Sequence, residues 1–228
     1  MAPVNKKLKS LLAFLLVFGP AITLIFISTR GCSHKFRNLN DFGPVQMDTF
    51  EIYNPTSKMF EKATLKDFEG DILVISSLQP SCPENCIISL WHFEQLIYNH
   101  VFENKHKKLK QVKILSFLTD ELGNDLSDIR FFENTYESLS GKLENFDPSL
   151  WYFARGNTKS IYNIESNGEN LLYSSEREYG PGAYLKYLML VDKESHLRMV
   201  LPADKEGEIR VMFQHLTLLQ KEYSQKRK

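Results

Sequence analysis

Residues 72–92 read Ile72-Leu-Val-Ile-Ser-Ser-Leu-Gln-Pro-Ser-Cys82-Pro-Glu-Asn-Cys86-Ile-Ile-Ser-Leu-Trp-His92. The apolar run from Ile72 to Leu78 is typical of a buried β-strand. A proline-containing turn follows, and apolar residues then recur near helical spacing, at Ile87, Leu90, Trp91, Phe93 and Leu96. The stretch therefore predicts a strand that turns into a helix, with two cysteines at the junction.

The spacing of these cysteines leaves three kinds of chemistry open. The N–H groups and the dipole at a helix N-terminus stabilise a thiolate. If the first helical turn includes both residues, Cys82 and Cys86 share one face with α-carbons roughly 6 Å apart, within the range of a disulfide. Two adjacent thiolates also suit Cu(I). From the residues alone, the pair is compatible with a redox couple, a metal site and a structural disulfide.

Composition narrows the function classes. The 228 residues include 28 Lys+Arg and 28 Asp+Glu, so the chain has no overall basic field. This balance argues against nucleic acid as the main partner. The chain has three cysteines, and one remains if Cys82 and Cys86 pair. We interpret that third residue, Cys32, as a free or lipid-facing thiol.

The N-terminal region has the pattern of a membrane anchor. Every residue from Leu11 to Ile27 is apolar or small except Thr23. We expect a short basic tail at 1–9, an uncleaved transmembrane helix at 10–29 and a tether at 30–45. A lipoprotein signal ending at Cys32 is the alternative, although Arg30 sits poorly inside one. The short tail and large C-terminal domain favour an N-in, C-out orientation, while the flanking charges do not decide it.

The remaining residues, 46–228, predict one α/β domain. We expect a hairpin from 47–53 and 59–65, strands at 72–78, 112–118, 151–154, 187–191 and 197–201, and helices to about 102, at about 127–140, from about 157 and after Gly207. We interpret residues 165–182 as a polar loop. This order predicts a central mixed sheet with helices on both faces. The cysteine pair then lies at the carboxyl end of a strand, where such sheets usually bind or react.

The chain resembles the Sco/SenC family over roughly residues 36–224. Cys82-Pro-Glu-Asn-Cys86 matches the family's Cys-Pro-x-x-Cys motif after a hydrophobic strand. Lys66-Asp-Phe-Glu-Gly-Asp71 is similar to the approach to that strand, and Ile114-Leu-Ser-Phe-Leu-Thr-Asp120 is similar to the strand that follows. A single N-terminal span fits the family's anchor.

The resemblance implies a fold, a cofactor and a partner. It implies a thioredoxin-like domain in which Cys82 and Cys86 form a redox pair and bind copper, Cu(I) rather than Cu(II). The implied partner is the copper-site subunit of cytochrome c oxidase, or another thiol or copper protein. The implied location is the inner membrane, single-pass, with the domain on the periplasmic or intermembrane-space side.

One departure from the family concerns its third copper ligand, a histidine just before a late strand. That position falls at about Tyr184 in this sequence. His196 lies at the far end of the strand and is a poor substitute, because several extended residues at about 3.3 Å each separate the two positions. The alternatives for the third ligand are an exogenous ligand and the thioether of Met189 or Met199. Pro181 has two interpretations, a cis-proline packed on the cysteines and a simple loop proline.

Three functional hypotheses follow. The first is a Sco-like copper-binding or thiol-reducing assembly factor for cytochrome c oxidase. The second is a membrane-anchored thiol–disulfide oxidoreductase without copper, in which Cys82 attacks and Cys86 resolves. The third is a degenerate family member that acts only as a binding scaffold.

Overall fold

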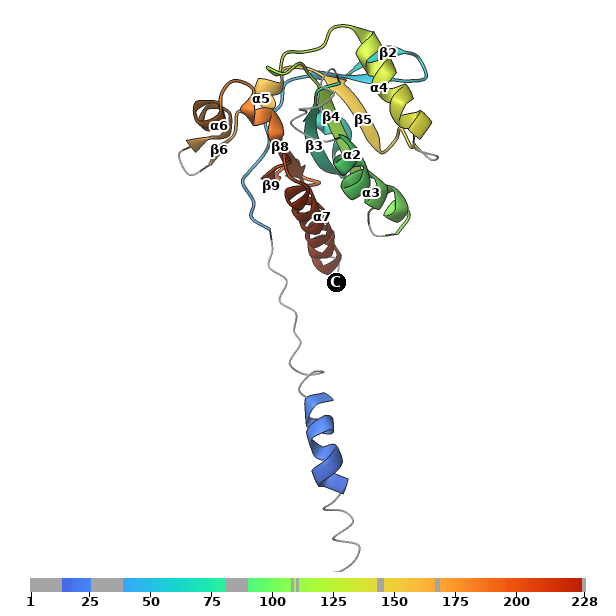
Figure 1. Cartoon of the computed structure of the whole chain (residues 1–228), viewed down its shortest axis with the longest axis vertical. Coiled ribbons are helices and arrows are strands. Elements are labelled where there is room, and N and C mark those ends of the chain that lie inside the picture. Colours follow the sequence, from blue (N-terminus) through green and yellow to red (C-terminus); the bar gives the residue numbers. More distant parts are fainter. Residues whose placement is uncertain are drawn as a thin grey trace, which may run out of the picture. The chain divides into compact units, whose positions relative to one another are not determined.

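The computed structural model describes residues 14–25, 39–80, 90–107, 109, 111–142, 146–166 and 169–226 (Figure 1). The chain divides into two compact units, Met1–Arg37 and Asn38–Lys228. Cys82, Cys86 and Cys32 lie outside the described residues. The structure therefore defines the frame that holds the cysteine motif rather than the motif itself.

In the first unit, residues 14–25 form a helix. Its large apolar side chains are exposed on all sides, for example Leu16 at 74% and Leu24 at 68%. We expected a transmembrane helix over 10–29. None of the helices in the described parts of the chain is both long enough and apolar enough to cross a bilayer.

The second unit is built on a mixed sheet. Seven of the described strands form it, in the order β2-β1-β5-β4-β3-β8-β9. Their bounds are β1 Phe50–Asn54, β2 Met59–Ala63, β3 Ile72–Leu78, β4 Val112–Leu118, β5 Trp151–Arg155, β8 Tyr187–Val191 and β9 Leu197–Pro202. A separate two-stranded ribbon pairs β6 (Glu165–Ser166) with β7 (Glu169–Asn170).

The cysteine motif follows the most buried strand of this sheet. All seven residues of β3 are buried. β3 pairs in parallel with β4, which pairs in parallel with β5, and β3 pairs antiparallel with β8. A mostly apolar run suits a strand covered on both faces. For this reason the bounds predicted from the sequence for β3 and β4 agree with the observed ones.

Helices cover both faces of the sheet, as expected (Figure 1). On one face, the side chains of Ile72, Val74 and Leu78 join a core formed with α3 (Asn99–Asn104), α4 (Ile129–Lys142), α7 (Glu206–Lys226) and the segment before α3. On the other face, Leu73 and Ile75 pack with α5 (Thr158–Tyr162), α6 (Leu171–Tyr179) and two 3₁₀ turns, η1 (Leu65–Phe68) and η3 (Ala183–Lys186). The alternation along β3 follows from the two-residue period of a strand.

The helix after the motif is interrupted. Its described part begins with α2 (Leu90–Phe93), continues as a π-helical turn, η2 (Glu94–Tyr98), and ends as α3. Phe93, Ile97 and Val101 are fully buried against the sheet. π-turns are rare and occur often near functional sites. The predicted end of this helix, near Phe102, is close to the observed one.

The prediction for residues 165–182 was wrong, because this segment contains β6, β7 and α6. The Asn170 side chain accepts a hydrogen bond from the Tyr173 N–H at 3.2 Å and caps α6. Ser174 and Ser175 donate to backbone carbonyls one turn earlier, at 2.7 and 2.9 Å. Only Leu172 and Ser175 are buried in this helix, so its apolar periodicity is weak.

Candidate functional site

The frame of the candidate site is the edge of the sheet where β3 and β4 end. The motif segment 81–89 lies between Pro80, two residues after β3, and Leu90, the first residue of α2. η3 lies at the same edge, because β8 runs antiparallel to β3 and begins directly after η3. The ends of β3 and β4 and the η3 turn therefore lie at the same edge of the sheet.

Gln79, three residues before Cys82, is held against the end of β4. The Leu78 carbonyl accepts a hydrogen bond from the Thr119 N–H at 3.0 Å. The Gln79 amide donates to the Thr119 hydroxyl at 3.3 Å, and both side chains are buried. The sequence analysis missed Gln79, although a polar residue at the end of a buried apolar strand is a usable signal.

A pair of buried hydroxyl groups ties β3 to β8 at the same edge. Tyr162 donates to the Tyr187 carbonyl at 3.0 Å, so the Ser77 hydroxyl, 3.1 Å away, donates to the Tyr162 oxygen. Burial raises the pKa of Tyr162 well above its ordinary value, and the phenol stays neutral. These groups fix the end of β3 and the start of β8 relative to each other.

Tyr184 occupies the position where the family resemblance expects a histidine, and it belongs to the core. Its side chain is fully buried, and its ring centre is 5.2 Å from that of Tyr162. Its hydroxyl donates to the Leu122 carbonyl at 3.4 Å and lies 3.5 Å from the Thr158 hydroxyl. Burial raises the pKa of Tyr184. A buried neutral phenol with these neighbours is a packing group and not a copper ligand.

The turn after β4 is held by one carboxylate. Asp120 accepts hydrogen bonds from the Leu122 and Asn124 N–H groups, each at 2.8 Å, and from the Asn124 side chain at 2.7 Å. Burial acts to raise the pKa of Asp120, but these hydrogen bonds outweigh it and the pKa lies below the ordinary value. The ionised carboxylate therefore shapes the turn after β4.

The described histidines do not complete a metal site. His196 lies in the β8–β9 turn, where its Nδ1 is 3.0 Å from both carboxylate oxygens of Asp41. The β8 register places this turn at the end of the sheet opposite to η3. His92 is partly exposed, and its Nε2 lies 3.9 Å from a Glu206 oxygen. No group of three His, Cys, Asp or Glu residues able to hold a metal occurs among the residues that the structure describes.

The other candidate ligands are also displaced from this edge. Met189 is fully buried opposite Ile75 in the middle of β3, and Met199 pairs with Leu190. The two methionines pack on opposite faces of the sheet. Pro181 is exposed, and no cis peptide bond occurs in the described parts of the chain. The structure therefore supports the interpretation of Pro181 as a loop proline.

Comparison with known proteins adds evidence on the fold. The sequence matches no protein-family model, and a search of curated proteins finds no match. Among solved structures, two candidate electron transfer or transport proteins from Aquifex aeolicus VF5 match with TM-scores of 0.51. Each is 11% identical to this chain; the alignments cover 79% and 80% of this chain and 98% and 99% of theirs.

A third solved structure is a SCO1/SenC family lipoprotein from Bacillus anthracis, with a TM-score of 0.49, 13% identity, and coverage of 80% of this chain and 99% of that one. The chain shares its mixed-sheet α/β fold with the two Aquifex aeolicus proteins. In the sequence, the motif segment follows β3, which lies between β4 and β8 in the sheet. At these identities the likeness concerns the fold alone.

Proposed function

We propose that this chain is a membrane-anchored, Sco/SenC-like thiol protein whose Cys82 and Cys86 bind Cu(I) or reduce the cysteines of a partner. The observation that supports the proposal is the position of the Cys-Pro-x-x-Cys segment in the sequence, between the buried strand β3 and the described helix α2. The core fixes both flanks of this segment. The proposed partner is the copper-site subunit of cytochrome c oxidase or another thiol or copper protein.

The exposed apolar helix in the first unit supports membrane attachment. A helix that is apolar on every side needs an apolar environment. The side chains from Phe14 to Phe18 and those of Ile22, Leu24 and Ile25 are all exposed. We propose that residues 10–29 provide this attachment and that the domain lies on the periplasmic or intermembrane-space side.

The cysteine motif suits Cu(I) better than Cu(II). Thiolates are soft ligands that suit Cu(I), and two of them are present in the motif. A harder, higher-coordinate Cu(II) site would need an imidazole, but Tyr184 is buried in the core and His196 is paired with Asp41. When bound, copper would be cargo to be delivered, and Cys82 and Cys86 would supply its two thiolate ligands.

Thiol exchange without copper is the second candidate, and the buried Tyr184 specifically favours it. In this cycle the Cys82 thiolate attacks a partner disulfide, which forms a mixed disulfide and releases one partner thiolate. The Cys86 thiolate then attacks the Cys82 sulfur and releases the second partner thiolate. The partner gains two electrons, this chain becomes a disulfide, and the protons of its two thiols pass to the partner.

A copper competition assay separates the two candidates. The full chain in detergent, reduced and carrying Cys32→Ser, is titrated with Cu(I) against a chromogenic chelator. The copper proposal predicts one Cu(I) per chain, with affinity reduced at least about 100-fold in Cys82→Ser and Cys86→Ser variants. Tyr184→Phe, which keeps the packing, is the control and should bind as the parent does.

Absence of thiol-dependent Cu(I) binding, together with turnover of a disulfide substrate, would instead establish the exchange reaction. If the cysteine substitutions change neither Cu(I) binding nor disulfide turnover, both candidates are wrong. In that case only the scaffold hypothesis remains.

A further inference from the structure

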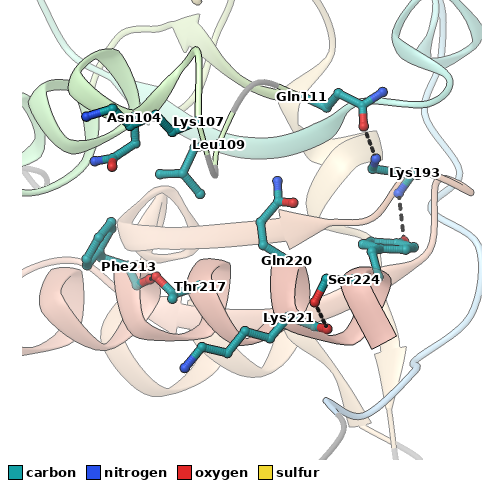
Figure 2. A pocket seen from close by; sticks show the side chains of 11 residues that line it. Asn104, Lys107, Leu109, Gln111, Lys193, Phe213, Thr217, Gln220, Lys221 and Ser224 are labelled. Atoms are coloured by element: carbon teal, nitrogen blue, oxygen red, sulfur yellow. Dashed lines mark hydrogen bonds between the residues drawn. The ribbon is translucent and has the colours of Figure 1, made fainter. Parts of the chain in front are cut away.

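A second candidate site lies at the other end of the domain, between α7 and the segment that joins α3 to β4. It is a cavity of about 540 Å³ (Figure 2). Small-molecule sites in proteins commonly measure roughly 300–1,000 Å³. The cavity faces the amino ends of β3 and β4. Gln111, which lines it, directly precedes β4. The Gln111 carbonyl accepts a hydrogen bond from the N–H of Ile72, the first residue of β3. The cavity is therefore separate from the cysteine motif.

The charged side chains that line the cavity are all positive. Lys107, Lys193 and Lys221 line the cavity, and no aspartate or glutamate is among its lining residues. Lysines are effective point-charge partners of phosphate groups. This lining favours an anionic ligand.

The cavity also offers a hydrogen-bond donor and an apolar surface. Gln220 projects from α7 into the space between Leu109 and Lys193 (Figure 2). Its amide nitrogen is buried, and it has no hydrogen-bond partner among the described residues. A buried donor without a partner costs free energy, which a ligand oxygen would recover. Leu109 and the ring of Phe213 provide apolar contact surface beside it.

The chain enters the domain next to this cavity. The Arg198 guanidinium donates to the carbonyls of Leu39 and Asn40, each at 2.9 Å. The same group contacts the Glu222 carboxylate at 3.0 Å, and Glu222 lies between the lining residues Lys221 and Tyr223. The segment that leads to the proposed membrane anchor therefore joins the domain beside the last turns of α7.

We propose that this cavity binds the phosphodiester headgroup of an anionic phospholipid. The lysines would pair with the phosphate, the Gln220 amide would donate to a headgroup oxygen, and Leu109 and Phe213 would contact the glycerol and first methylene groups. Lysines close to an anionic membrane surface are attracted to it electrostatically. The inference rests on the proposed membrane attachment and is independent of the thiol chemistry.

Native mass spectrometry of the full chain in non-ionic detergent tests this site. The probes are dioctanoyl phosphatidylglycerol, dioctanoyl phosphatidylcholine and soluble glycerol 3-phosphate. We expect one phosphatidylglycerol per chain, bound at least about tenfold more tightly than either other probe. Lys221→Glu should weaken it at least about tenfold, because a charge-assisted contact is lost and a repulsive one added. Thr217→Trp, which fills the cavity without changing its charge, should also abolish binding.

The matched control is Lys62→Glu, an exposed lysine on β2 at the opposite edge of the sheet. It should leave phosphatidylglycerol binding unchanged, and every variant should keep the thermal midpoint of the parent. Cys82→Ser/Cys86→Ser should bind phosphatidylglycerol normally, so failure of the thiol function would be seen separately. The proposal would be overturned if the two lipids bound equally well or if Lys62→Glu and Lys221→Glu weakened binding equally. It would also be overturned if glycerol 3-phosphate bound as tightly as phosphatidylglycerol.

Discussion

Gly123 lies where the turn after β4 meets Tyr184. Its φ is +81°, in the region that favours glycine. A β-carbon at this position would stand 2.0 Å from the Tyr184 hydroxyl oxygen. Gly182, before η3, is similar, since its φ is +76° and an added β-carbon would lie 2.5 Å from the Glu121 carbonyl oxygen. The two glycines allow the turn and η3 to pack together beside the motif.

Gly123→Ala should therefore destabilise the domain by at least about 2 kcal/mol, from left-handed backbone strain and overpacking. Adding Tyr184→Phe removes the clashing hydroxyl, so the double variant should be less destabilised than the sum of the two single variants. Urea unfolding of all three variants measures this coupling. Gly141→Ala, in α4 with nothing near its added β-carbon, is the control and should be neutral or slightly stabilising. Strict additivity would show that the Gly123–Tyr184 contact is absent.

His196 and Asp41 form a titratable pair that holds the chain at its entry to the domain. The hydrogen bond to Asp41 raises the pKa of His196, and the same bond lowers the pKa of Asp41. The contribution of His196 to folding stability is complete below about pH 6.5, the pKa of histidine in the unfolded chain. It is lost as the pH rises through the pKa of His196 in the folded protein. The aspartate contribution is present above its unfolded pKa and is lost as pH falls through the folded one.

An NMR titration of the His196 ring should give a pKa above that of an unfolded-chain histidine. Asp41→Asn should move that value back toward about 6.5. An unshifted His196 in the parent chain would contradict the pairing with Asp41.

At the residue scale, sequence reasoning succeeded where a position follows from strand register and failed where a contact joins distant segments. The register argument placed Tyr184 before β8 and His196 at the far end, and both positions are confirmed. The register argument did not predict the hydrogen bond between the Ser77 and Tyr162 hydroxyl groups, which are 85 residues apart in the sequence. The proximity of Cys82 and Cys86 stays a prediction, because both residues lie outside the described part of the chain.

At the element scale, the strands were predictable and α6 was not. β3, β4 and β8 are rich in apolar residues, so their bounds follow from the sequence. α6 has one buried leucine and is stabilised by the Asn170 cap and by serine hydroxyls. These local hydrogen bonds are equally compatible with turns, which is why the segment resembled a loop.

The cap gives a test of α6. Asn170→Ala should destabilise the domain by about 1 kcal/mol, since the Tyr173 N–H loses its acceptor. Asn170→Asp keeps an acceptor at the helix N-terminus and should cost much less. Hydrogen exchange of the Tyr173 amide reports the local effect. Equal protection of that amide in the parent and Asn170→Ala would show that the side chain does not cap the helix.

For the whole molecule, Arg198 connects three separate parts of the domain. Its guanidinium, with side-chain exposure of 6%, contacts Asp192 at 2.9 Å, Glu222 of α7 at 3.0 Å and the carbonyls of the entering chain. Burial acts to lower the pKa of Arg198, but its acidic partners outweigh this and raise it. The residue therefore joins β9, α7 and the start of the domain.

Arg198→Ala should cost about 3–5 kcal/mol, because it leaves two buried carboxylates without their cation. Arg210→Ala is the matched control, because that arginine is exposed in an i,i+4 pair with Glu206 and should cost less than about 0.5 kcal/mol. Denaturant unfolding of both variants gives the comparison. Similar small losses in the two variants would mean that the buried network does not hold the parts together.

The two thiols are the centre of the account, and their native reactivity tests it most directly. The reduced full chain, carrying Cys32→Ser, is alkylated under native conditions at pH 7, with a denatured sample as the reference. We predict that Cys82 reacts at least about tenfold faster than an unperturbed cysteine, because a helix N-terminus favours its thiolate, and that mild oxidation protects Cys82 and Cys86 together. Thiols that react only after denaturation, or that oxidise independently of each other, would contradict the account.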